Sequence, residues 1–290
     1  TLGTSPRVVD VFAEWQKFKG FRVKLGQFKR PFTFENPLHP IDQGFMSFGQ
    51  SVLKLSGFSD RTGEAASNGR DIGLQFQGDL FPNANGRALL HYQVGVFNGQ
   101  GINVKDADQR KDVIGGLWVM PIKGMRLGVF GWTGSYARKG TWVDENGVTQ
   151  NGIRKLQQRR YAISAEYAAN DWTFRSEYIH STGEAFAKSL VNTNDAAAKD
   201  CTLSSNGNKA QGVYALVIAP IVKKKLYAKA RYDMYQPSKG AEQQRTLCEI
   251  GLNYDFNQNV QLSSEYAHVH DRSLAKPDYS VVDVQLIFKF

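Results

Sequence analysis

The connections between the strand-like segments of this chain alternate between short and long from one end to the other. We count thirteen segments of about ten residues in which apolar and polar residues alternate. The short connections have two to seven residues, and nearly all of the others have a dozen or more. Because antiparallel neighbours place every short turn at one rim and every long loop at the other, this pattern predicts an antiparallel transmembrane β-barrel, an all-β fold.

A tilted strand of about ten residues is long enough to cross the core of a bilayer. One strand-and-turn pattern uses the whole chain, so we expect residues 1–290 to form a single domain. The predicted strands cover residues 8–16, 21–30, 70–80, 87–98, 112–120, 125–136, 159–167, 171–180, 211–219, 224–235, 246–256, 259–268 and 281–290.

The direction of the strands follows from the connections. In outer-membrane barrels the short turns lie at the periplasmic rim, so Phe290 is expected there and the first strand is expected to run toward the periplasm. Single-chain bacterial barrels usually have an even number of strands. Either an odd number of further strands precedes Thr1 or the pattern has missed some strands, and we expect the former.

Alternation alone would also suit a soluble barrel or sandwich, in which the polar face points outward. In the last strand Val282, Val284 and Leu286 share one face, while Asp283 and Gln285 share the other. Aromatic residues at the strand ends and the asymmetric connections favour apolar contact with lipid outside and water inside. A mean hydropathy of −0.41 with 22% charged residues excludes a helical membrane protein.

The effect of the net charge of +9 depends on where the cations lie. Several fall on the polar face that we expect to line the lumen, namely Arg22, Lys24, Arg70, Arg160, Arg175, Lys229 and Arg231. Acidic residues on the same face could pair with them and stiffen the wall. The alternative is a basic pore whose positive potential concentrates anions, and both can hold because cations remain in surplus.

The connection over residues 31–69 is rich in Phe, Gly and Pro and has few charges before Asp60. A loop that extends into water seldom has this composition, so we expect it to fold into the lumen and narrow the channel. Packing against a neighbouring subunit or lipopolysaccharide is the alternative.

Cys201 and Cys248 both fall at the long-loop rim, where a disulfide could tether a long loop to the wall. Two unpaired thiols are the alternative.

Three segments carry a resemblance to a known family. They are GQFKRPF at residues 26–32, followed by Glu35, then GRDIGLQ at residues 69–75 and VGVFNG at residues 94–99. The chain resembles the phosphate-selective porin O and P family over most of its length.

The resemblance implies a sixteen-stranded barrel, a homotrimer, a constricting third loop and a pore lined by basic residues. Three strands would then precede Val8. Lys29 and Arg30 would lie at the entrance to the constricting loop and Arg70 at its exit, where all three could contact anions. The chain lacks a dense row of arginines on one strand, so we expect a general, anion-preferring channel for phosphate or other small anions.

The function that we expect is passive diffusion of small hydrophilic solutes through the outer membrane of a Gram-negative bacterium, without a cofactor, a metal or a catalytic step. Its partners would be outer-membrane lipid and lipopolysaccharide, and not nucleic acid. An outer-membrane protease or phospholipase is one alternative, because His268, His270 and Asp271 lie at the end of a strand. A plugged structural or adhesion barrel is the other.

Overall fold

The thirteen predicted strands are present in the computed structural model, which describes residues 8–64, 67–190 and 199–288. They form one antiparallel sheet in which each strand pairs with its neighbours in chain order. This confirms the predicted all-β fold. The strands are β1 (Val11–Phe18), β2 (Phe21–Lys29), β3 (Arg70–Pro82), β4 (Ala88–Phe97), β5 (Asp112–Val119), β6 (Met125–Val143), β7 (Thr149–Ala169), β8 (Trp172–Thr182), β9 (Lys209–Val222), β10 (Leu226–Gln236), β11 (Arg245–Asp255), β12 (Val260–Asp271) and β13 (Asp278–Phe288).

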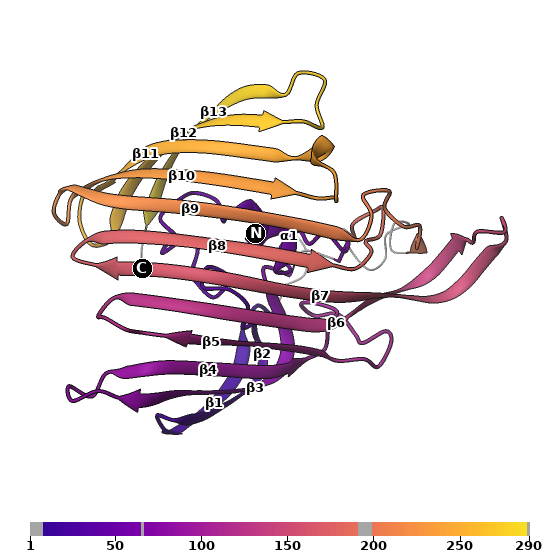
Figure 1. The fold of residues 1–290 in the computed structure, drawn as a ribbon, viewed down its shortest axis with the longest axis horizontal. Coiled ribbons are helices and arrows are strands. Elements are labelled where there is room, and N and C mark those ends of the chain that lie inside the picture. Colours follow the sequence, from indigo (N-terminus) through magenta and orange to yellow (C-terminus); the bar gives the residue numbers. More distant parts are fainter. Residues whose placement is uncertain (1–7, 65–66, 191–198, 289–290) are drawn as a thin grey trace.

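The sheet curls around one of its faces (Figure 1). Across the described residues, β1 and β13 are the edge strands and do not pair with each other, so these strands make an incomplete barrel. The helical pieces are short: α1 (Gln50–Leu55) lies in the connection between β2 and β3, and the 3₁₀ turn η2 (Ala241–Gln243) precedes β11.

No helix in the described part of the chain has both the length and the apolar character needed to cross a bilayer.

The structure differs from the sequence prediction in β6 and β7. Residues 137–158 were predicted to be a loop, but most of them extend these two strands into a long hairpin closed by a tight turn at Asp144 and Gly147. Figure 1 shows this hairpin projecting beyond the ends of the neighbouring strands. A hairpin outside the bilayer has no lipid-facing side, so its sequence lacks the apolar alternation on which the prediction relied.

The two faces of the sheet have different surroundings. On the outer face, apolar side chains such as Val282 (71% exposed) and Ile163 (56%) have no protein cover, as expected of a surface that lies against lipid. On the inner face, side chains pack against the connection between β2 and β3. Its helix α1 contacts β8, β9 and β10.

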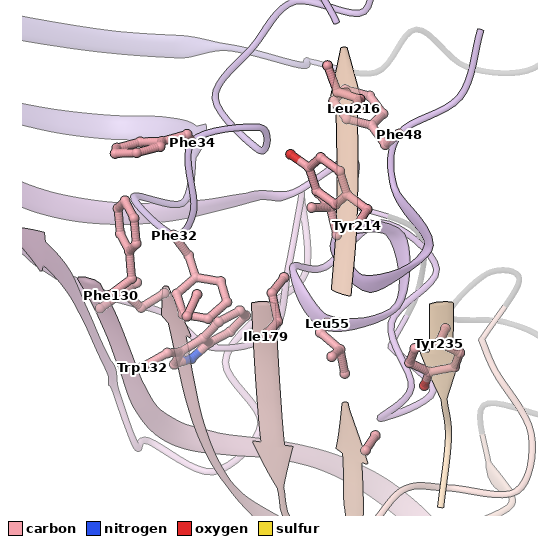
Figure 2. Close-up of a cluster of buried hydrophobic side chains, with 14 of the residues drawn as sticks. Phe32, Phe34, Phe48, Leu55, Phe130, Trp132, Ile179, Tyr214, Leu216 and Tyr235 are labelled. Carbon is pink, nitrogen blue, oxygen red and sulfur yellow. The ribbon is translucent and has the colours of Figure 1, made fainter. Parts of the chain in front are cut away.

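The main apolar cluster lies between this connection and the inner face of the wall (Figure 2). The ring of Phe32 packs edge-on against Trp132 at 5.5 Å between centroids, and Phe34 packs edge-on against Phe130 at 5.3 Å. Both phenylalanines are almost completely buried. Burial of each ring stabilises the packed arrangement by roughly 2 to 3 kcal/mol, so the apolar residues of the connection hold it against the wall.

Candidate functional site: the lumen

Residues 31–69, called the lumen segment below, lie along β10 and are held there by a series of hydrogen bonds. Lys229 Nζ donates to the carbonyl oxygen of Gly44 at 3.1 Å, and Arg231 Nη1 donates to that of Ser47 at 2.7 Å. One step further along the strand, Asp233 Oδ2 accepts from the backbone N–H of Gln50 at 2.8 Å. Alternate residues of β10 thus bind every third residue of the lumen segment.

Carboxylates on other strands bind the same segment through its backbone N–H groups. Glu177 Oε1 on β8 accepts from Phe34 at 2.6 Å and from Glu35 at 3.0 Å. Glu265 Oε1 on β12 accepts from Met46 at 2.9 Å. Because a buried backbone N–H without a partner is costly, the charged wall satisfies polar groups that the lumen segment cannot pair within itself.

The two ends of the lumen segment, called its neck, meet where β2 ends and β3 begins. Lys29 and Arg70 are directly paired in the ladder, and the backbone N–H of Arg30 donates to the carbonyl of Gly69 at 2.8 Å. The Arg30 guanidinium is fully buried, 2.9 Å from Glu64 and 3.2 Å from Asp71. Lys29 Nζ, also predicted to lie at this entrance, donates to the carbonyl oxygen of Leu38.

Five of the nine cations predicted to contact anions are buried in ion pairs. Each has a carboxylate within 2.5 to 2.9 Å, and none has more than 5% of its surface exposed. These groups face inward as predicted, but they hold the lumen segment and the wall together and have no open surface for a solute. They are Arg30 with Glu64, Arg160 with Asp60, Arg175 with Glu166, Lys229 with Glu265, and Arg231 with Glu249.

The lumen segment leaves a cavity of about 310 Å³ on the side of β1 to β4. Three cations line it, Lys24, Lys29 and Arg70, together with one carboxylate, Asp10. Pro31, Pro37 and His39 contribute the wall formed by the lumen segment, and the remaining lining residues are Phe12, Phe28, Gln75, Gln77 and Gln93. The lining carries more positive than negative charge.

Arg70 and Asp10 neutralise each other within this basic cavity. The guanidinium donates from Nε at 2.9 Å and from Nη2 at 2.7 Å to the two carboxylate oxygens. Hydrogen bonding from Arg70 lowers the pKa of Asp10 below its ordinary value, so the pair stays ionised. Arg22, which lies nearer the short-turn rim, is similarly paired with Asp79 at 2.7 Å.

Lys24 differs from the other cations of the basic cavity. Its Nζ lies 3.7 Å from the ring centroid of Phe12 and 4.6 Å from that of Phe28. In the chain as described, Lys24 makes no ion pair. Aromatic faces attract a cation without neutralising it, so the Lys24 ammonium keeps its charge available to a solute.

Glu35 is a site residue whose role the sequence did not reveal. It is fully buried, and its Oε2 accepts from the backbone N–H of Gly49 at 3.0 Å. Burial, together with the nearby carboxylate of Glu177, raises the pKa of Glu35 to about 7. An acidic residue among the phenylalanines of a loop was the available signal, because such a group needs partners once the loop is buried.

The expected disulfide between Cys201 and Cys248 is absent, and both cysteines are free. Cys201 is buried beside Tyr136 and Phe186, under the β6–β7 hairpin. Cys248 is exposed on the outer face of β11, opposite His268. Proximity to the same rim could be inferred from the sequence, but the burial of Cys201 against Tyr136 and Phe186 could not.

The two histidines at the end of β12 both approach the carboxylate of Asp278. His270 Nδ1 lies 2.7 Å from Asp278 Oδ1, and His268 Nε2 lies 3.6 Å from the same oxygen. Ser280 Oγ hydrogen-bonds the hydroxyl of Tyr266 at 2.9 Å. The described residues contain no group of three or more His, Cys, Asp or Glu side chains placed to hold a metal ion.

Comparisons with known proteins show which solved structures share this fold. No protein-family model matches the chain, and no curated protein matches its sequence. Among solved structures, the chain is similar to a loop L8 deletion mutant of OmpT, an outer membrane protein of Vibrio cholerae, with a TM-score of 0.57 and 12% identity over 93% of this chain and 76% of the other.

Two further outer-membrane proteins share the fold. An anion-selective porin from Comamonas acidovorans matches with a TM-score of 0.56 and 12% identity over 91% of this chain and 71% of the other. OprB of Pseudomonas putida matches with a TM-score of 0.56 and 10% identity over 97% and 72%. At such low identities the likeness shows the fold alone, and that fold is the integral outer-membrane β-barrel.

Proposed function

We propose that this protein is an outer-membrane porin of a Gram-negative bacterium, through which small hydrophilic solutes diffuse passively and anions pass in preference to cations. The observation that carries the proposal is the basic cavity between the lumen segment and β1 to β4, with the unpaired Lys24 in its wall. The shared fold with an anion-selective porin supports it. Phosphate is one candidate solute, by the resemblance of residues 26–32, 69–75 and 94–99 to the phosphate-selective family.

The geometry suggests how solutes pass. The lumen segment fills the space beside β8 to β12, where β10 and the carboxylates bind it, and leaves room beside β1 to β4. An anion entering there meets positive charge from Lys24 and Lys29 and hydrogen-bonding groups from Gln75 and Gln77. These groups replace part of its hydration shell, while a cation is repelled. Transport needs no cofactor and no chemical step.

Planar bilayer recordings of the full-length protein test the charge preference. The reversal potential under a KCl gradient should show anion preference in the wild type, and Lys24→Glu should shift it toward cations. Lys223→Glu makes the same charge change at a short turn outside the lumen and should leave the reversal potential unchanged. Cation preference in the wild type would contradict the proposal, and a complete lack of conductance would favour a plugged barrel.

The proposal assigns no enzymatic activity. The hydroxyl of Ser280 hydrogen-bonds that of Tyr266, and both His268 and His270 approach the carboxylate of Asp278, so none of these described groups pairs a nucleophile with a base. Phospholipid or peptide turnover that disappears in His270→Ala would overturn this part.

We also propose a homotrimer, from the family resemblance. The mass of the purified protein in detergent would test it.

A further inference from the structure

A row of polar residues crosses three strands on the outer face of the sheet. Arg159 on β7 is directly opposite Thr182 on β8, and Thr182 is directly opposite Lys209 on β9. Both cationic residues are exposed and Thr182 is partly so. With two strand spacings between them, the backbones of Arg159 and Lys209 are about 10 Å apart. We call these three residues the outer basic row.

The outer basic row lies immediately beyond the apolar surface of β7 and β8. The next outward-facing residues toward the short-turn rim are Tyr161 and His180, whose rings stack at 5.2 Å. Ile163 follows on β7 and is 56% exposed. Aromatic residues of barrels mark the depth at which the hydrocarbon core meets the headgroups. The outer basic row is therefore level with the headgroups, on the long-loop side.

The charges of the outer basic row are not neutralised by the protein. In the chain as described, neither Arg159 nor Lys209 makes an ion pair, and the only hydrogen bond from Thr182 Oγ1 goes to the backbone oxygen of Arg159. Further out on the same hairpin, Lys139 and Lys155 are also exposed and without ion pairs. Within the outer basic row, the hydroxyl of Thr182 lies between the two cations.

We propose that the outer basic row binds the phosphorylated headgroup of a glycolipid in the outer leaflet. Long loops face the outside of the cell, so the leaflet beside the row is the outer one. Two cations and a hydroxyl at headgroup depth match a phosphate-bearing headgroup in charge, while its acyl chains lie along the apolar surface around Ile163. The row is outside the lumen, so this inference is independent of anion diffusion through the pore.

Lipid binding to the full-length protein in a non-ionic detergent tests the proposal, read by native mass spectrometry. Diphosphoryl lipid A is the probe, and fully dephosphorylated lipid A is its matched control. Arg159→Gln with Lys209→Gln should weaken binding of the phosphorylated probe by about fivefold for each charge removed. Thr182→Glu, which places a carboxylate between the two cations, should weaken it as well.

The control variant carries Lys223→Gln with Lys224→Gln, the same loss of charge at the opposite rim, and should bind as the wild type does. Equal binding of the phosphorylated probe by the row variant and this control would overturn the proposal. So would wild-type binding that does not depend on the phosphates, or displacement of the probe by millimolar inorganic phosphate. If an oligomer dissociated in the row variant alone, the result would overturn the proposal and indicate that the row is a contact between copies of the chain.

Discussion

Arg160 on β7 binds Asp60 of the lumen segment with two hydrogen bonds, from Nη1 at 2.6 Å and from Nη2 at 2.8 Å, across a separation of 100 residues. Both side chains are at most 2% exposed. Nη1 also donates to the carbonyl of Leu55 at 2.7 Å, at the end of α1. One guanidinium therefore fixes both the end of α1 and the return of the lumen segment toward the neck.

Asp60→Asn should release this part of the lumen segment. Removing one partner of a buried ion pair leaves the other charge uncompensated, which costs about 3 to 5 kcal/mol. We expect a lower midpoint of thermal unfolding and a larger, noisier single-channel conductance. Lys188→Gln is the control, because its pair with Asp200 is exposed and worth less than about 1 kcal/mol. Unchanged conductance in Asp60→Asn would show that this ion pair does not constrain the channel.

The close approach of Phe34 to β6 depends on Gly128. A Cβ added to Gly128 would lie 2.9 Å from Cζ of Phe34, and also 2.9 Å from Cβ of Trp118. Gly128→Ala should therefore destabilise the protein by about 1 to 3 kcal/mol through overpacking. Phe34→Leu should recover part of this loss in the double variant, as measured by thermal unfolding in a double-mutant cycle.

Gly131 on the same strand provides the matched control. A Cβ there would meet nothing within 4 Å, so Gly131→Ala should leave stability nearly unchanged. If Gly128→Ala and Gly131→Ala had equal effects, the loss would come from the strand backbone and not from the contact with Phe34.

The free state of both cysteines can be checked by thiol labelling without reductant. Cys248 in detergent should react with a maleimide in the native protein, because its side chain is exposed on β11. Cys201 has no exposed surface and should react only after unfolding. A reductant should leave the unfolding midpoint unchanged. Recovery of a peptide that joins the two residues would contradict the structure.

The face of each strand residue could be predicted from the sequence, but its contacts could not. Alternation correctly placed Arg160 and Arg231 on the inner face. Which carboxylate each one meets depends on how the lumen segment crosses the lumen, and Asp60 is 100 residues from Arg160. Most of the cations that were predicted to contact anions therefore anchor the lumen segment.

For Lys24 too, the face of the strand could be predicted from the sequence, but the neighbouring side chains could not. Its position on the inner face followed from alternation, but its freedom from an ion pair follows from the rings of Phe12 and Phe28 beside it. Phe12 points toward the lumen, against the preference of apolar residues for the lipid face, and so could not be assigned as a neighbour of Lys24 from hydropathy. Local register, which pairs Glu14 with Lys24, sets this contact.

The packing of the lumen segment should depend on pH through Glu35. The pKa of Glu35 rises from 4.5 to about 7 on burial, so the folded segment binds the proton more tightly than the unfolded chain does. The resulting stability is complete below about pH 4.5, falls as the pH rises from there to about 7, and is constant above it. Thermal unfolding and channel noise, measured from pH 5 to pH 8, should show a looser segment at the higher pH. Glu35→Gln should flatten this dependence, because an amide cannot ionise. An equally steep profile in Glu35→Gln would assign the effect to another group.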